Sequence, residues 1–363
     1  MKYWIYIFSF IVCASCQSSQ PDAIEIQLGE DIVVPKHYIV TKTTDSIVID
    51  GKASEPSWAA AQFTDKFIDI EGVNIPKFDT QVKLLWDDNY LYIYAQLEEP
   101  HIWGTLTERD AIIYYNNDFE VFIDPSGTGY GYGEIEINAL NTVWDLYLNK
   151  PYRVGGNANF EWNLNELKTE VYCSGSLNNP SDTDALWTVE MAIPLKPFVA
   201  LKNRPKTIPK EGEQWRINFS RVQWDHDLID GNYYRKKENG KYLREYNWVW
   251  SNQKVINMHE PEKWGFLQFT ELDNSDDVSF IQDKDLEIKQ LAFALFRKTR
   301  YGDLKYLLDS PQGSTRKIIA NYSETDVVEA TFFKTNFGFE YELKSPKTEK
   351  VYYINQEGKL KEL

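Results

Sequence analysis

Apolar and polar residues alternate along much of the chain between residues 47 and 269. In the run 91–97 the odd positions are apolar, while Tyr92, Tyr94 and Gln96 occupy the even ones. The same alternation recurs at 118–123, 134–138, 187–193 and 216–220. A period of two is typical of strands with one face toward a core. Turn-forming residues separate these runs at 87–89, 124–127, 155–157 and 210–212. Short alternating strands without long helices between them predict an all-β fold, an antiparallel sandwich or barrel.

The pattern changes after Leu272. Residues 273–277 are polar and acidic, which indicates a boundary. Residues 283–298 carry apolar side chains at helical spacing and predict an amphipathic helix. Strand-like stretches follow at 327–333, 337–343 and 351–354, the last of them turning near 355–358. We therefore predict a sandwich domain over 41–272 and a small α+β C-terminal appendage of unknown role over 273–363. We interpret 17–40 as a tether with one strand-like run, 24–28.

The first sixteen residues have the pattern of a bacterial lipoprotein signal. Lys2 gives a positive start, residues 4–12 are apolar, and the small residues Ala14 and Ser15 precede Cys16. We predict cleavage before Cys16 and acylation of its thiol, which would anchor the chain to the outer membrane in the cell envelope. Ordinary secretion and a retained N-terminal anchor are the alternatives.

Composition narrows the classes of partner. The net charge of −16 argues against nucleic acid, which is itself a polyanion. Of the three cysteines only Cys173 lies outside the predicted signal, so no disulfide framework or cysteine metal site is expected. The chain has 12 Trp and 23 Tyr, whose flat rings stack on sugar rings but also fill the cores of large sandwiches.

Signals for catalysis are sparse. Asp118 and Glu120 share a strand face about 6.6 Å apart, a separation that would permit glycoside hydrolysis. Acidic pairs of this spacing are also common on solvated strands. Asp225, within the polar run Asp225-His226-Asp227, is a further candidate, and a solvated loop rim explains it as well. The sequence has neither a Gly-x-Ser-x-Gly elbow nor paired metal-binding histidines. A binding protein is favoured over a hydrolase.

Six segments together carry a family resemblance. They are 49–58 (with Ile49-Asp50-Gly51, Glu55 and Trp58), 85–92 (Leu-Trp-Asp-Asp-Asn-Tyr-Leu-Tyr), 117–125 (Asn-Asp-Phe-Glu-Val-Phe-Ile-Asp-Pro), 187–194, 215–221 (Trp-Arg-Ile-Asn-Phe-Ser-Arg) and 261–267. In order and spacing, over about 47–269, the chain resembles family 9 carbohydrate-binding modules within the DOMON-like sandwiches. The resemblance implies a two-sheet antiparallel β-sandwich whose loops and one sheet edge hold a sugar.

The resemblance also implies positions for a sugar site. Family members clamp a terminal sugar between two aromatic rings, and the first ring falls here on Tyr114. The family glutamate that accepts sugar hydroxyls falls on Glu120. The second ring position falls on Met258, and a family arginine is replaced by Glu136. Both departures change side chains that would contact the sugar and leave the expected fold unaffected.

Other side chains complete the predicted site. Trp103, Trp248 or Trp250 could supply the missing ring. Arg216 and Asn218 share a polar strand face and are candidate sugar hydrogen-bonders. Arg221 is a further candidate, either as a sugar contact or as an ion-pair partner of Glu120. By contrast, Trp86, Trp187 and Trp215 fall on the inward side of their strands and are assigned to the core.

We therefore predict a non-catalytic, lipid-anchored carbohydrate-binding protein that serves glycan capture or breakdown, with a surface glycan-utilisation complex as partner. No cofactor is expected, apart from a structural Ca²⁺ for which Asp87 and Asp88 are weak candidates. The alternatives are a hydrolase using Asp118, Glu120 or Asp225, a haem-binding DOMON-type domain with Met258 and a histidine as axial ligands, and a structural subunit docked through residues 273–363.

Overall fold

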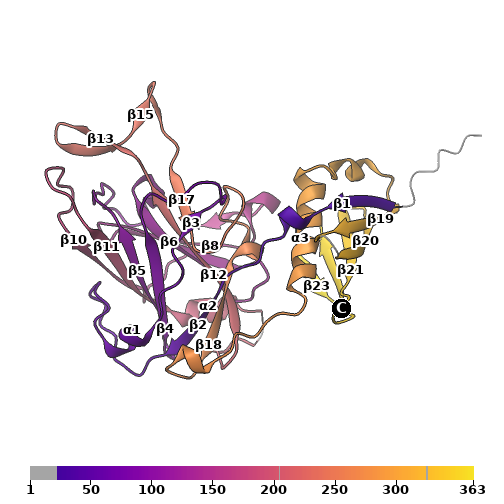
Figure 1. The fold of residues 1–363 in the computed structure, drawn as a ribbon, viewed down its shortest axis with the longest axis horizontal. Coiled ribbons are helices and arrows are strands. Elements are labelled where there is room, and N and C mark those ends of the chain that lie inside the picture. The colour runs from indigo at the N-terminus through magenta and orange to yellow at the C-terminus, as the bar shows by residue number, and fades with distance from the viewer. Residues whose placement is uncertain (1–22, 204, 324–325) are drawn as a thin grey trace, which may run out of the picture.

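The computed structural model describes residues 23–203, 205–323 and 326–363. A large β-sandwich occupies one side of the molecule, and a smaller α+β domain lies beside it (Figure 1). The predicted acylation site Cys16 lies outside the described residues. No helix among the residues that the structure describes is long and apolar enough to cross a membrane.

The strands of the sandwich coincide with the alternating runs of the sequence. They are β2 (His37–Lys42), β3 (Ile68–Asp69), β4 (Thr80–Trp86), β5 (Tyr90–Glu98), β6 (Asp118–Asp124), β7 (Tyr132–Asn138), β8 (Val143–Leu148), β9 (Ala158–Asn159), β10 (Lys168–Ser174), β11 (Leu186–Pro194), β12 (Gln214–Gln223), β17 (Tyr246–Val249) and β18 (Gly265–Thr270). Two hairpins project from it, β13 (His226–Ile229) with β14 (Asn232–Arg235) and β15 (Lys237–Glu238) with β16 (Lys241–Tyr242). Two short helices, α1 (Pro56–Ala60) and α2 (Leu195–Leu201), pack at its edges (Figure 1).

The two sheets of the sandwich are joined through one strand. One sheet has the order β10-β11-β5-β4 and the other β18-β12-β6-β7-β8-β9, with β17 paired to β12 and β3 to β17. Strand β2 connects them, because it pairs with β18 along its length and with β4 over two residues. Both β2 pairings are parallel, which departs from the purely antiparallel prediction. The other strand pairs of this domain are antiparallel, as predicted.

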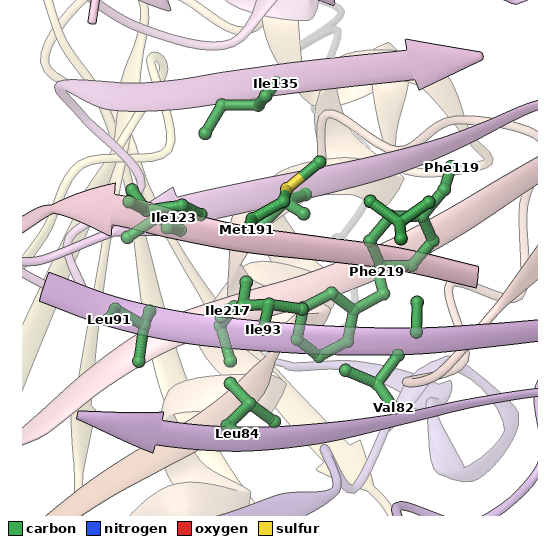
Figure 2. Close-up of a cluster of buried hydrophobic side chains, with 14 of the residues drawn as sticks. Val82, Leu84, Leu91, Ile93, Phe119, Ile123, Ile135, Met191, Ile217 and Phe219 are labelled. Carbon is green, nitrogen blue, oxygen red and sulfur yellow. The ribbon is translucent and has the colours of Figure 1, made fainter. Parts of the chain in front are cut away.

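The core lies between the facing sheets. Figure 2 shows side chains such as Leu84 and Ile93 from one sheet and Phe119 and Phe219 from the other, all members of one buried hydrophobic cluster. The three tryptophans assigned to the core are at most 1% exposed, which confirms that assignment: Trp86, Trp187 and Trp215. Burial of large apolar side chains is the main stabilising contribution to such a fold.

The C-terminal domain consists of one helix on a six-stranded sheet. The helix α3 (Leu286–Tyr301) packs against β21 and β22, and the sheet order is β1-β19-β20-β21-β22-β23. Its strands are β1 (Ala23–Gln27), β19 (Thr315–Asn321), β20 (Val327–Lys334), β21 (Phe339–Lys344), β22 (Val351–Asn355) and β23 (Leu360–Glu362). The predicted helix at 283–298 is thus shifted by three residues, and the predicted hairpin at 355–358 joins β22 to β23.

The predicted tether at 17–40 is wrong for its described part. Strand β1 is the edge strand of the C-terminal sheet and runs parallel to β19, with Ala23 opposite Lys317. Further along, β2 begins at His37 inside the sandwich. One segment thus pairs with β19 at the edge of the C-terminal sheet, and the other lies between β18 and β4 in the sandwich. The N-terminal segment therefore belongs to both domains.

The domains meet at a buried ionic cluster. Glu262, in the 3₁₀ helix η4 (Pro261–Lys263), accepts hydrogen bonds from Arg153 at 2.7 Å and from Arg297 of α3 at 2.8 Å. These charges hold the pKa of Glu262 down at about 2, despite its burial, with Arg153 the larger opposing cause. Val154, beside Arg153, inserts into the apolar core of the C-terminal domain. The C-terminal domain is thus fixed against two loops of the sandwich.

Candidate functional site

An open cleft of about 650 Å³ lies on the outer face of the sheet that contains β6, β7 and β8. Its side chains are aromatic, aliphatic, amide and carboxylate, and it has the size of a small-molecule site. The residues that line it are Ile70, Ile112, Tyr114, Glu120, Phe122, Glu134, Glu136, Trp144, Leu146, Tyr152, Phe160, Glu245, Asn247, Ile256, Asn257, Met258 and His259.

Strand alternation places the carboxylates on the floor of this cleft. Odd-numbered residues of β6 point into the sandwich core, so Glu120 points outward beside Asp118. Glu136 of β7 lies directly opposite Glu120 in the register of the two strands. Trp144 of β8 in turn lies opposite Glu136. Three adjacent strands therefore bring two glutamates and a tryptophan into one row.

Three rings stack along one side of the cleft. Tyr114, in the 3₁₀ helix η2 (Ile113–Tyr115), has its ring centroid 6.4 Å from that of Trp144 with 30° between the planes. The Trp144 ring is in turn 5.7 Å from Phe160 at 19°. Tyr114 and Phe160 are 37% and 55% exposed, so both offer ring surface to a ligand. A row of near-parallel rings provides a flat apolar platform.

The floor is electrostatically unusual. Burial raises the pKa of Glu120 to about 7. Burial, followed by the charge of Glu120, raises the pKa values of Glu134, Glu136 and Asp118 well above their ordinary range. No lysine or arginine is found among the described side chains that line the cleft. The cleft therefore concentrates carboxyl groups, and no described lysine or arginine of its lining can offset their negative charge.

The lining of the cleft also includes Tyr152, Met258 and His259. The Tyr152 ring lies 4.6 Å from the imidazole of His259, which is also within 3.0 Å of the Tyr132 hydroxyl. Burial, with the charge of Arg153, lowers the pKa of His259 to about 4, so its ring is neutral at pH 7.

Met258 lines the cleft at the predicted second clamp position without providing a ring. The haem interpretation needs Met258 and a histidine on opposite faces of a porphyrin. His259, its neighbour in the chain, cannot occupy that place. His101 and His226 contact each other and Tyr233, and His37 stacks on Phe280, so none of these three histidines lines the cleft.

The structure brings together only Tyr114 and Glu120 of the predicted sugar-contacting residues. Asn218 is fully buried, and its amide bonds the backbone of Ser251 in both directions at 2.9 Å. Arg216 donates to the Trp264 carbonyl at 2.7 Å and covers the ring of Phe266. These two side chains stabilise the loop and strand next to them rather than lining the cleft.

Arg221, Trp250 and Trp103 are likewise placed away from the cleft. Arg221 is fully buried and pairs with Glu99 at 3.1 Å, so the suggested ion pair with Glu120 is not formed. Trp250 is 1% exposed in the sandwich core, as is Trp248, the other suggested ring. Trp103 is 2% exposed.

Trp103 borders a second hollow of about 450 Å³ near the β13–β14 hairpin, where it stacks 6.2 Å from Tyr233. Asp225 lies beside the same hairpin, where it pairs with Lys77 at 2.6 Å and accepts from the Tyr246 hydroxyl. The polar run at 225–227 therefore leads into the β13–β14 hairpin, since His226 and Asp227 are the first residues of β13.

The calcium candidates at Asp87 and Asp88 are accounted for by turn chemistry. Both oxygens of Asp87 are engaged, one by the backbone N–H groups of Asn89 and Tyr90 and the other by the Tyr92 hydroxyl. Asp88 pairs with Lys42 at 2.7 Å. A carboxylate that closes a turn in this way has no free oxygen pair to offer a metal ion.

Sequence reasoning missed the rings that accompany Tyr114. Trp144 stands at an even position of β8, opposite Glu136, so its place follows once β7 and β8 are paired. Tyr152 and Phe160 lie in loops, where no periodicity indicates direction. The residue next to Tyr152 is Arg153, so the ionic cluster with the C-terminal domain also fixes this rim of the cleft.

Residues 49–272 match the family model described as carbohydrate family 9 binding domain-like. No curated protein matches the sequence. Among solved structures, a candidate carbohydrate-binding protein from Bacteroides uniformis is 16% identical, with a TM-score of 0.48 over 65% of this chain and 100% of its own. A family 9 module from Caldicellulosiruptor kristjanssonii in complex with cellotriose is 15% identical, with a TM-score of 0.42 over 68% of this chain and 100% of its own.

Proposed function

The chain belongs to the carbohydrate family 9 binding domain-like family, and from this premise we propose that its cleft binds a carbohydrate without catalysing its breakdown. The observation that supports the proposal is the row of rings Tyr114, Trp144 and Phe160 beside hydrogen-bonding groups in one open cleft. The C–H face of a pyranose stacks on such rings, while its hydroxyls need acceptors and donors at the edge. The carboxyls of the floor and the amides of Asn247 and Asn257 provide both.

The arrangement of the carboxyl groups favours binding over hydrolysis. Glycoside hydrolysis needs an acid and a base that flank the bond and differ in protonation. Here Asp118 is fully buried next to Glu120 and Glu136 of the floor, and burial raises the pKa of all three. A sugar on the rings would have these groups on one side only. The hydrolase alternative predicts product release that Glu120→Gln abolishes in a folded protein.

We further propose that acylation of Cys16 anchors the protein to the outer membrane, where it captures glycan pieces for breakdown by partner proteins. The support is the signal-like pattern of residues 1–16. Globomycin, which blocks the lipoprotein signal peptidase, should cause accumulation of the uncleaved precursor. A Cys16→Ala variant that still fractionates with the membrane would contradict the anchor.

The binding proposal is tested by calorimetry on the chain from residue 17 onward, which keeps every described residue. A panel of plant, host and microbial glycans, including glucose and cellotriose, is titrated into the protein. The substitution Trp144→Ala removes one stacked ring. It should raise the dissociation constant about fivefold or more, because such a contact contributes about 1 kcal/mol.

Tyr172→Ala is the matched control, since Tyr172 is 42% exposed on β10 and does not line the cleft. It should bind as the unaltered protein does. A panel that gives no heat, or equal losses in Trp144→Ala and Tyr172→Ala, would overturn the proposal.

A further inference from the structure

The floor of the cleft holds carboxyl groups closer together than a sheet normally tolerates. One oxygen from each of Asp118, Glu120 and Glu136 lies within 4.8 Å of the others. The three residues are 0%, 6% and 2% exposed. Like charges directly opposite on neighbouring strands destabilise a sheet, and Glu120 and Glu136 form such a pair. A folded protein that keeps this arrangement requires a positive partner or bound protons.

The hydrogen bonds at the floor leave acceptors free. Asp118 accepts the Val222 N–H through Oδ1 at 3.2 Å, and Glu136 accepts the Tyr114 N–H through Oε2 at 3.0 Å. Within the part of the chain that the structure describes, Oδ2 of Asp118 is buried without a hydrogen-bond partner. The same holds for Oε2 of Glu134, which is 5% exposed and lines the cleft. Buried oxygens without donors are rare and indicate a ligand that is not protein.

Among the described residues, no lysine or arginine forms an ion pair with these three carboxyls. No described lysine or arginine lines the cleft, and Arg221 on β12 is engaged by Glu99. His259 is held by its contact with the Tyr132 hydroxyl and is neutral at pH 7. A positive partner for the three carboxyls would therefore be a ligand taken from solution.

We propose that Asp118, Glu120 and Glu136 form a binding site for a divalent cation with a preference for oxygen ligands, of which Ca²⁺ is the type. Calcium binds oxygens at about 2.3–2.6 Å, so two of its ligands lie at most about 5 Å apart, and the 4.8 Å spacing fits. Glu134 stands next to the three on the floor as a further carboxylate. Calcium takes six to eight oxygens. The open side of the cleft leaves the remaining positions to water or to hydroxyls of a sugar stacked on Trp144.

The cation then links the two halves of the cleft. The register of β7 and β8 places Trp144 directly opposite Glu136, so a sugar ring stacked on Trp144 would lie beside the proposed ion. A sugar would be held by stacking on one face and by coordination of its hydroxyls to the ion. This second step rests on the proposed function, whereas the metal site does not.

The test is calorimetry with CaCl₂ alone on the chain from residue 17 onward, followed by Tb³⁺ luminescence excited through the tryptophans. We expect binding of one ion per chain and Tb³⁺ emission that CaCl₂ displaces. Asp118→Asn and Glu136→Gln keep the size of each side chain and remove one negative charge. Each should weaken Ca²⁺ binding at least tenfold, with circular dichroism showing that the fold is retained.

Asp88→Asn is the matched control, because Asp88 is an acidic turn residue outside the cleft. It should bind Ca²⁺ as the unaltered protein does. The absence of Ca²⁺ heat at millimolar concentration, or equal binding by Glu136→Gln, would overturn the metal site. If glucosamine binds more tightly than glucose in the presence of chelator and Ca²⁺ gives no heat, the cation is the ammonium group of the sugar, and the metal site is overturned.

The two proposals fail separately. Ca²⁺ binding without binding of any glycan would leave the metal site and remove the proposed function. Glycan binding that is equally tight in Ca²⁺ and in chelator, with no heat of Ca²⁺ binding, would remove the metal site and leave the proposed function.

Discussion

Glu262 offers a sharp test of how the two domains are held together. The substitution Glu262→Gln keeps the shape of the side chain and removes the charge that Arg153 and Arg297 share. The Glu262 carboxylate has a pKa of about 2, against an ordinary value of 4.5. A difference of this size corresponds to about 3 kcal/mol of stability at pH 7, because each pH unit is worth 1.36 kcal/mol.

The pH dependence has a definite sign. The pKa of Glu262 is lower in the folded state, so its contribution is complete above pH 4.5 and is lost as the pH falls toward 2. At pH 3 less than half of it should remain. The difference in free energy of unfolding between the unaltered protein and Glu262→Gln should therefore shrink in acid. Arg153 keeps its ion pair with Glu260 at 3.0 Å, whereas Arg297 loses its charged partner, which adds to the loss of stability at pH 7.

Urea unfolding followed by tryptophan fluorescence measures this difference. Of the 12 tryptophans, Trp4 lies near the start of the chain and the others lie within residues 41–272, so the signal reports the sandwich and its docked loops. Glu329→Gln is the matched control, since Glu329 pairs with Lys317 on the surface. Such exposed pairs contribute about 0–1 kcal/mol. A loss below about 1 kcal/mol for Glu262→Gln at pH 7, or an equal loss at pH 3, would refute the reasoning.

Three further predictions concern packing. Gly265→Ala places a Cβ 2.2 Å from Cζ3 of the Trp250 ring, so unfolding in urea should need about 1–3 kcal/mol less free energy. Leu295→Ala opens a cavity under α3, where Leu295 is fully buried; hydrogen exchange should show the C-terminal sheet destabilised by about 2–5 kcal/mol, and unchanged exchange would contradict its burial. Arg221→Met leaves Glu99 buried without its guanidinium, which should lower stability by about 3–5 kcal/mol at pH 7, and a neutral result by thermal unfolding would show that the pair contributes nothing.

Much of the sandwich follows from the sequence because its signals are local. Alternation in runs such as 91–97 identifies both the strand and its inward face, and the tryptophans on that face are buried as expected. The family resemblance then orders the strands. The alternation and the family resemblance both identify the strands, and neither tells in which direction a loop side chain points.

The site was less predictable because it depends on strand pairing and loop direction. Glu120 looks like a residue of a solvated strand face, yet it is 6% exposed because neighbouring loops cover that face. Arg221 follows the polar residues of β12 in the sequence but points into the interior, where Glu99 compensates its charge. Tyr152 and Phe160 have no periodic signal, so their rings could be placed only by the structure.

The pairing of β1 with β19 has a consequence for the order of synthesis. Ala23 is made among the first residues of the described chain, and its partner Lys317 comes 294 positions later (317 − 23). At about 5–20 residues per second, β1 waits roughly 15–60 s for the strand that completes its sheet. During that time the nascent chain carries an unpaired strand beside a sandwich that can already fold, and such edges are where association with the wrong partner begins. The C-terminal domain, which is synthesised last, therefore completes its sheet with β1, a strand that was synthesised before the sandwich.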